Sequence, residues 1–113
     1  MTKKKRATYI ELLTRLVNRL AAAKGERLWP VMEHTGYSCN LTDVTTDDIR
    51  NAILGLATTL PDENLRCVVG GAAFQCEMAG ISVLADGHAD SYLKHHRAEA
   101  LFLYASRDPE DFL

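Results

Sequence analysis

The stretch DENLRCVVGGAAFQCEMAGISVL, residues 62–84, decides the fold because it is apolar on nearly its whole circumference when drawn as a helix. At about 100° per residue, one face of this helix gathers the residues expected to contact the core: Leu65, Val68, Val69, Ala72, Ala73, Cys76, Ala79 and Val83. A second apolar stripe follows the opposite side: Cys67, Phe74, Met78 and Ile81. Such a helix is either the buried centre of a bundle or packs against its own chain with one stripe and against another chain with the other.

A first helix is predicted over residues 8–25, where apolar residues recur with the helical period. Thr8 and Glu11 have the spacing of a capping box, which would keep the cationic residues 3–6 outside the positive end of the helix dipole. Residues 1–7 are therefore expected to form a flexible basic tail.

A second helix is predicted over residues 45–60, directly before the helix of residues 62–84. Thr45 or Thr46 is the expected N-cap, acidic residues follow in the first turn, and Pro61 ends the helix. A helical period recurs in residues 88–106 and predicts a further helix there, and residues 107–113 are predicted to form an acidic tail.

Residues 26–44 lose the helical period and predict an irregular connector with one short turn after Pro30. The connector holds the only tryptophan, Trp29, together with Tyr37. A connector of this length in a small domain either covers the core or has a function. The pattern as a whole predicts an all-α four-helix bundle with this connector between its first two helices, as a single domain over residues 1–113.

The composition limits the classes of function. The chain has 113 residues, 47% of them apolar and 25% charged, as in a soluble globular domain. A net charge of -2 argues against a nucleic-acid-binding surface, and no apolar segment approaches the ~20 residues of a membrane span. Cys39, Cys67 and Cys76 form an odd set with no C-x-x-C pair, which favours buried free thiols and a reducing cytoplasm.

Three of the four histidines lie within residues 88–96, but their spacing does not make a metal site. His88 and His95 are about 10 Å apart along a helix, too far to share an ion bound at about 2 Å. His95 and Glu99 are one turn apart and are expected to form a weak pair on a solvated face. His96 falls on the apolar face, where a packed imidazole is expected.

The sequence carries no phosphate-binding loop and no nucleophile motif. We therefore expect a protein without catalytic residues, bound metal or cofactor: a small cytoplasmic accessory, adaptor or inhibitor, of the phage-encoded or immunity-protein kind, that binds another protein or itself. Its partner is expected to be a protein, with a homodimer as the simplest assembly and no membrane contact. The expected interface residues are Phe74, Met78, Cys67, Ile81, Trp29 and Tyr37.

Two alternatives remain open at this point. A metal-binding or enzymatic helical bundle would gather ligands from separate parts of the chain: His95, Glu99, Glu77 and His34. A weak nucleic-acid-binding module would instead use the basic N-terminus with further cationic side chains: Arg15, Arg19, Lys24 and Arg27.

Overall fold

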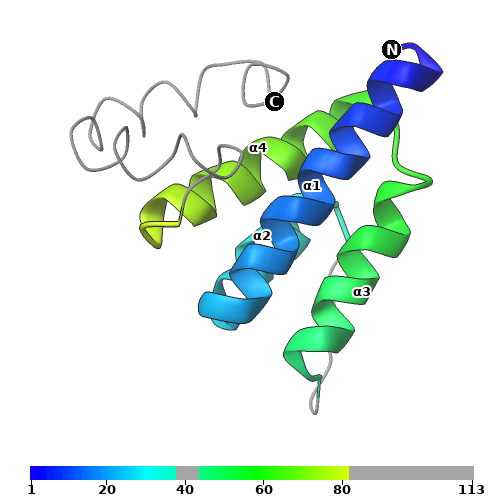
Figure 1. Ribbon diagram of the computed structural model, residues 1–113. Coiled ribbons are helices and arrows are strands. Elements are labelled where there is room, and N and C mark those ends of the chain that lie inside the picture. The colour runs from blue at the N-terminus through cyan, green and yellow to red at the C-terminus, as the bar shows by residue number, and fades with distance from the viewer. Residues whose placement is uncertain (38–43, 82–113) are drawn as a thin grey trace.

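The computed structural model describes residues 1–37 and 44–81, and the regular secondary structure within these residues is helical (Figure 1). Their elements are, in chain order, α1 (Lys3–Ala23), the 3-10 helix η1 (Gly25–Arg27), α2 (Leu28–Glu33), α3 (Thr46–Ala57) and α4 (Asp62–Met78). The predicted all-α class is confirmed for this part of the chain. The helix expected at 88–106 and the acidic tail expected at 107–113 lie outside the described residues.

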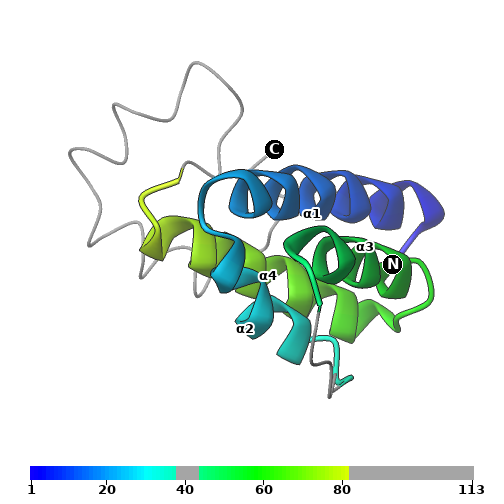
Figure 2. The ribbon, with the colours of Figure 1, turned by 90° about the horizontal axis from the view of Figure 1, so that it is seen from below.

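Helix α4 packs against α1 and α2, and α3 packs against the same two helices at another side (Figure 2). Its buried residues include Leu65, Val68, Val69, Ala72, Ala73 and Cys76. These six belong to the face that the period of the sequence assigned to the core. From α1 the core receives Tyr9, Leu12, Leu13, Leu16, Val17 and Leu20. One face of α4 thus belongs to the core, and α4 is not the buried centre of the bundle.

Small side chains on α4 let both neighbours come close. A Cβ atom on Gly71 would clash with Cδ2 of His34, so the ring at the end of α2 occupies the space that a larger residue would need. On the α1 side, the Cys76 thiol donates a hydrogen bond to the carbonyl of Leu16 at 3.6 Å. The two contacts hold α4 between α2 and α1.

Helix α4 ends at Met78, so the predicted range of 62–84 is too long. Gly80 has a φ of 73°, in the left-handed region that glycine adopts without strain. The Ile81 amide donates to the carbonyl of Cys76 at 2.8 Å and the Gly80 amide to that of Glu77 at 3.1 Å, which is the Schellman ending of a helix. Apolar residues continue beyond this stop and concealed it in the sequence pattern.

Helix α1 begins at Lys3 rather than at Thr8, which overturns both the predicted capping box and the flexible tail of residues 1–7. The Thr2 hydroxyl caps the helix by accepting from the Lys5 amide at 3.1 Å. Thr8 is inside the helix, where its hydroxyl donates to the carbonyl of Lys4.

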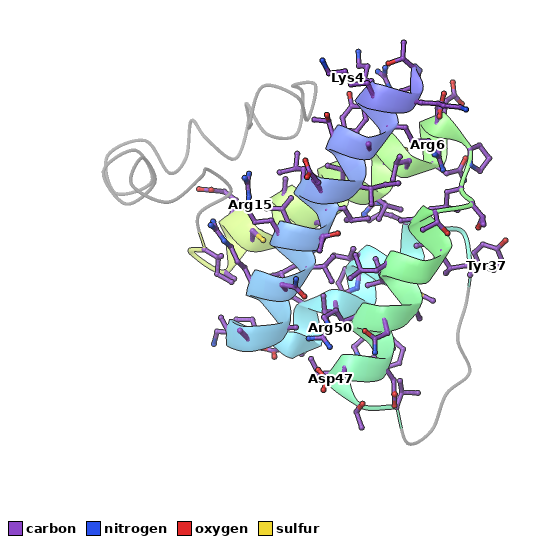
Figure 3. All side chains as sticks on the ribbon, turned by 45° about the vertical axis from the view of Figure 1, so that its right-hand side comes forward. Lys4, Arg6, Arg15, Tyr37, Asp47 and Arg50 are labelled. Carbon is purple, nitrogen blue, oxygen red and sulfur yellow. The ribbon has the colours of Figure 1, made fainter. Side chains whose placement is uncertain are left out.

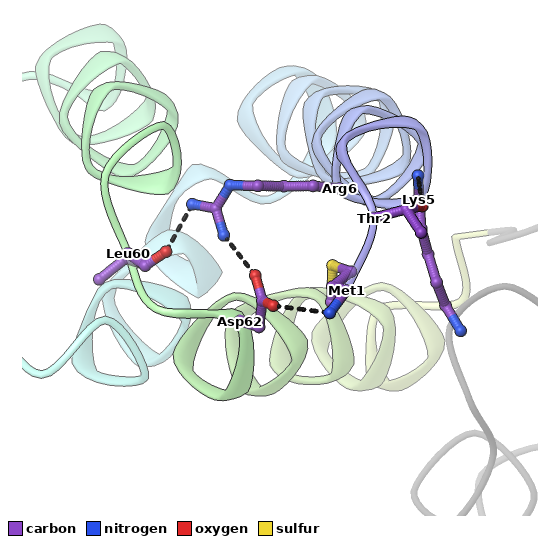
Figure 4. Close-up of polar contacts among 6 residues, drawn as sticks. All are labelled: Met1, Thr2, Lys5, Arg6, Leu60 and Asp62. Atoms are coloured by element: carbon purple, nitrogen blue, oxygen red, sulfur yellow. Dashed lines mark hydrogen bonds and ion pairs between the residues drawn. The ribbon is translucent and has the colours of Figure 1, made fainter.

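Arg6 gives the physical reason for this early start, because its guanidinium reaches the turn between α3 and α4 (Figure 4). It donates to a carboxylate oxygen of Asp62 at 2.9 Å and to the carbonyls of Ala57 and Leu60. The amine of Met1 lies 3.0 Å from the other oxygen of Asp62. That contact, and the contact with Arg6, lower the pKa of Asp62 despite some desolvation. A negative charge next to the first turn of α1 offsets the cost of lysines at that end of the helix dipole.

The segment after α1 is more regular than predicted. Residues 25–27 form η1 and residues 28–33 form α2, so the helix starts before Pro30 instead of after it. Pro30 is the third residue of α2, where the amide that proline lacks has no partner within the helix. Burial of Leu28, Val31 and Met32 makes this short helix part of the core.

Helix α3 spans Thr46–Ala57, somewhat shorter than the predicted 45–60, and Thr45 is its N-cap. Thr45 and Asp48 form a capping box, in which the Asp48 amide donates to the Thr45 hydroxyl and the Thr45 amide donates to the Asp48 carboxylate. Of the two caps considered from the sequence, Thr45 is therefore the one used.

The Arg6 contacts predict a specific loss of stability. Replacing Arg6 by alanine should lower the free energy of unfolding by about 1–3 kcal/mol, because two carbonyls and a carboxylate lose a charged donor. Arg6→Lys keeps the charge but loses the forked pair of donors, so its free energy of unfolding should lie between those of the wild type and of Arg6→Ala. Urea unfolding measures the change, with Lys4→Ala on the exposed side as the control. Equal effects of Arg6→Ala and Lys4→Ala would contradict this assignment.

The two adjacent glycines should respond differently to alanine. A Cβ on Gly70 would meet no atom within 4 Å, so Gly70→Ala should raise the free energy of unfolding by about 0.5–1 kcal/mol through helix propensity. Gly71→Ala should give this gain only when His34 is also replaced by alanine, because the ring fills the site. Thermal unfolding of the single and double variants tests this, and an equal gain for both single variants would disprove the close contact.

Candidate functional site

Three apolar residues lie on the exposed side of α4 and are called here the α4 stripe: Cys67, Phe74 and Met78. They fall within about 40° of one another around the helix axis. Phe74 is 38% and Met78 42% exposed, although the opposite face of the same helix is fully buried. The structure therefore brings these three of the six predicted interface residues onto one surface.

Ile81 does not continue the α4 stripe as predicted. It follows the glycine that ends α4, so the helical period no longer determines its direction. Its side chain is partly buried and packs against the core. This contact is the apolar one that often accompanies a Schellman ending.

Trp29 and Tyr37, the other two predicted interface residues, are exposed by 39% and 55%. Trp29 lines an open pocket of about 340 Å³ between the η1–α2 segment and the start of α3. The pocket is lined by Gly25, Glu26, Trp29, Val44, Thr45, Thr46 and Ile49. Tyr37 projects outward beside α3 in Figure 3.

Helix α2 separates Trp29 from the α4 stripe. His34, at the end of α2, lies against Gly71 of α4. Trp29 is five residues earlier, which places it about 140° away from His34 around the helix axis and toward α3. The predicted interface residues thus belong to different faces of the molecule.

Cationic side chains lie on both flanks of the α4 stripe. On the α2 side, the Arg27 guanidinium donates to the side-chain oxygen of Gln75 at 3.1 Å. On the α1 side, the Arg66 guanidinium lies 5.8 Å from the centre of the Tyr9 ring. Arg15 projects from α1 on the side opposite to Arg6 (Figure 3). The sequence did not single out these flanks because their residues come from three separate helical segments.

The Cys76 thiol is fully buried and chemically protected. Burial raises its pKa to about 12 from an ordinary 9.0, while the charges of Arg19 and Arg15 lower the pKa and that of Glu77 raises it by smaller amounts. Cys67, about 180° away on the same helix, is exposed. The predicted burial of free thiols is therefore confirmed for Cys76 and wrong for Cys67, and Cys39 lies outside the described residues.

Glu77, a ligand in the metal-binding alternative, is a fully buried carboxylate on α4. It lies close enough to Cys76, together with Arg15 and Arg19, for all three charges to act on the thiol. A charged residue on an amphipathic helix is normally solvated, so the helical period alone does not predict this burial.

Two ligands of the metal-binding alternative, His34 and Glu77, lie among the described residues, and the structure does not bring them together. His34 lies against Gly71, and Glu77 is about 120° further around α4 and about 9 Å along it. Within residues 1–37 and 44–81, no group of three or more His, Cys, Asp or Glu side chains has the arrangement of a metal site. His88, His95, His96 and Glu99 lie outside these ranges.

The basic N-terminus differs from the arm that the nucleic-acid alternative required. Arg6 is turned toward the α3–α4 turn, and Arg27 is bonded to Gln75. Lys3 and Lys4 remain exposed on the first turn of α1. In the described part of the chain, no helix combines the length and apolarity of a membrane span.

No protein-family model matches the chain, and no curated protein or solved structure is significantly similar to it. Its function is therefore argued from its own residues.

The two described thiols should differ in reactivity in the folded protein. At pH 8, iodoacetamide should modify Cys67 readily, whereas Cys76 should react only in denaturant because its thiol is buried and stays protonated. Peptide mapping by mass spectrometry measures each site separately. Equal labelling of the two residues under native conditions would show that the α1–α4 contact is not as described.

Proposed function

We propose that this chain is a small accessory, adaptor or inhibitor protein that acts by binding another protein, without catalysis, through the α4 stripe. The observation that carries the proposal is the exposure of Phe74 and Met78 on a helix whose opposite face is buried in the core. Apolar side chains gathered on one exposed side of a helix are typical of a protein-binding surface.

The placement of the α4 stripe favours binding over a role in the fold. Its three residues lie on the side of α4 turned away from the core residues Leu65 and Val69. A binding surface on a rigid, well-packed helix needs little ordering when it meets a partner, which limits the entropic cost of association.

The proposal includes three further points that the sequence predicted. The chain forms a four-helix bundle, it works in the cytoplasm, and it forms a homodimer as its simplest assembly. Phe74 and Met78 would then lie at or beside the two-fold axis.

A photo-cross-linker tests this proposal in the living cell. The full chain carries p-benzoylphenylalanine at position 74 or 78, with position 51 as the control because Asn51 is exposed on α3. We expect discrete adducts from positions 74 and 78 but not from 51, and an adduct of twice the chain mass identifies a homodimer. Adding Met78→Glu should abolish the adduct formed from position 74. Cross-linking no stronger at 74 than at 51 would refute the proposed surface.

A further inference from the structure

The pocket beside Trp29 is built from two separate parts of the chain and shares no residue with the α4 stripe. The η1–α2 segment supplies Gly25, Glu26 and Trp29, and the start of α3 with the residues before it supplies Val44, Thr45, Thr46 and Ile49. All of them belong to the described part of the chain. A volume of about 340 Å³ is at the lower end of the range for small-molecule sites. The pocket therefore has room for one side chain or one small molecule.

The two walls of the pocket are held together by direct packing. The Thr46 side chain lies so close to Gly25 that a Cβ atom there would clash with it. Ile49, one turn further along α3, is 2% exposed and anchors this wall in the core. The pocket is thus formed before a ligand arrives, which limits the entropic cost of binding.

The polar groups of the pocket make it acidic. Among the described residues that line it, Glu26 alone is charged. The Asp48 carboxylate accepts a hydrogen bond at 3.0 Å from the amide of Thr45, a lining residue, and the hydrogen bonds with Thr45 lower the pKa of Asp48. Asp48 is therefore ionised at neutral pH. The positive end of the α3 dipole would favour an anion, but Asp47 and Asp48 in the first turn offset it.

Neighbouring cations do not neutralise this charge. Arg27 follows Glu26 in the chain, but its guanidinium reaches across to Gln75 of α4. Arg50 lies 3.4 Å from Asp47, and both are labelled on α3 in Figure 3. Lys24 is exposed and is not among the residues that line the pocket. A cationic ligand is thus favoured over an anionic one.

Trp29 determines which cation fits best. It is 39% exposed, so part of its indole ring is open to the pocket. A planar guanidinium stacks on an aromatic ring, its forked donors match a carboxylate, and it is less strongly hydrated than an ammonium group. Hydroxyl groups such as those of Thr45 and Thr46 can accept hydrogen bonds from its remaining N–H groups.

We propose that this pocket binds a guanidinium group, with its plane on the Trp29 ring and with Glu26 accepting its N–H donors. The group belongs either to an arginine side chain of another protein or to a small guanidino compound. The inference goes beyond the proposed function because it assigns a second site to another face of the molecule. Its failure would leave the α4 stripe unaffected.

Trp29 is the only tryptophan of the chain, so its fluorescence reports on this pocket. The full chain is titrated at constant ionic strength with N-acetylarginine amide, with the lysine analogue and with the uncharged citrulline analogue. The arginine compound should give a saturable change in emission with a Kd of about 1–10 mM. The citrulline compound, which has the same shape without the charge, should bind at least ~5-fold more weakly. The lysine compound should lie between them.

Glu26→Gln should weaken binding of the arginine compound about fivefold, and Glu11→Gln, at an exposed position of α1, should leave it unchanged. Trp29→Leu should also weaken it about fivefold, measured by saturation-transfer NMR of the ligand because the fluorescent probe is lost. Circular dichroism identical to that of the wild type shows that each variant is folded.

The site would be disproved by the absence of saturation up to ~20 mM, by equal affinities for the arginine and citrulline compounds, or by indifference to Glu26→Gln. Tighter binding of N-acetylglutamate amide would show that the α3 dipole prevails and would also overturn the proposal. The pentapeptide Ala-Ala-Arg-Ala-Ala, capped at both ends, distinguishes the two sources. At least ~5-fold tighter binding of this peptide than of the arginine compound identifies an arginine of a protein, and equal affinities identify a small guanidino compound.

Discussion

The packing of α4 between α1 and α2 is the constraint on which the rest of the structure depends. Gly71 admits the His34 ring on one side, and the Cys76 thiol meets the Leu16 carbonyl on the other. A larger residue at position 71 would have to displace the His34 ring. Because α4 is held in this way, its orientation about its own axis is determined, and so is the side that faces outward.

The outward side of α4 acquires its properties from that orientation. Turning the helix so that Val69 and Cys76 face α1 necessarily turns Phe74 and Met78 away from the core. The same arrangement brings α1 and η1 to either side of α4, and with them the arginines of the two flanks. The exposed apolar stripe is thus a consequence of how the core is packed, and the proposed function uses it.

The sequence predicted features that depend on neighbours along the chain. The core face of α4 and the Thr45 cap follow from periodicity and from a local hydrogen-bonding pattern, and both are confirmed. The start of α1 could not be predicted because Arg6 binds Asp62, 56 positions away, and nothing near Arg6 signals that partner. The end of α4 was missed because apolar residues continue past Gly80, whose left-handed backbone stops the helix. The helical period was enough to predict the α4 stripe as a shared surface. It could not show that Trp29 lies on another face, because that depends on the placement of α2.

The central claim is that one side of α4 belongs to the core and the other to a binding surface. The most direct measurement compares the free energy of unfolding of the full-length Phe74→Glu and Val69→Glu variants with that of the wild type, by urea denaturation. The account predicts a loss within about 1 kcal/mol for Phe74→Glu, and a loss of more than ~3 kcal/mol or failure to fold for Val69→Glu, which buries a charge. Comparable losses for the two variants would show that Phe74 is a core residue and that α4 has no outward binding side.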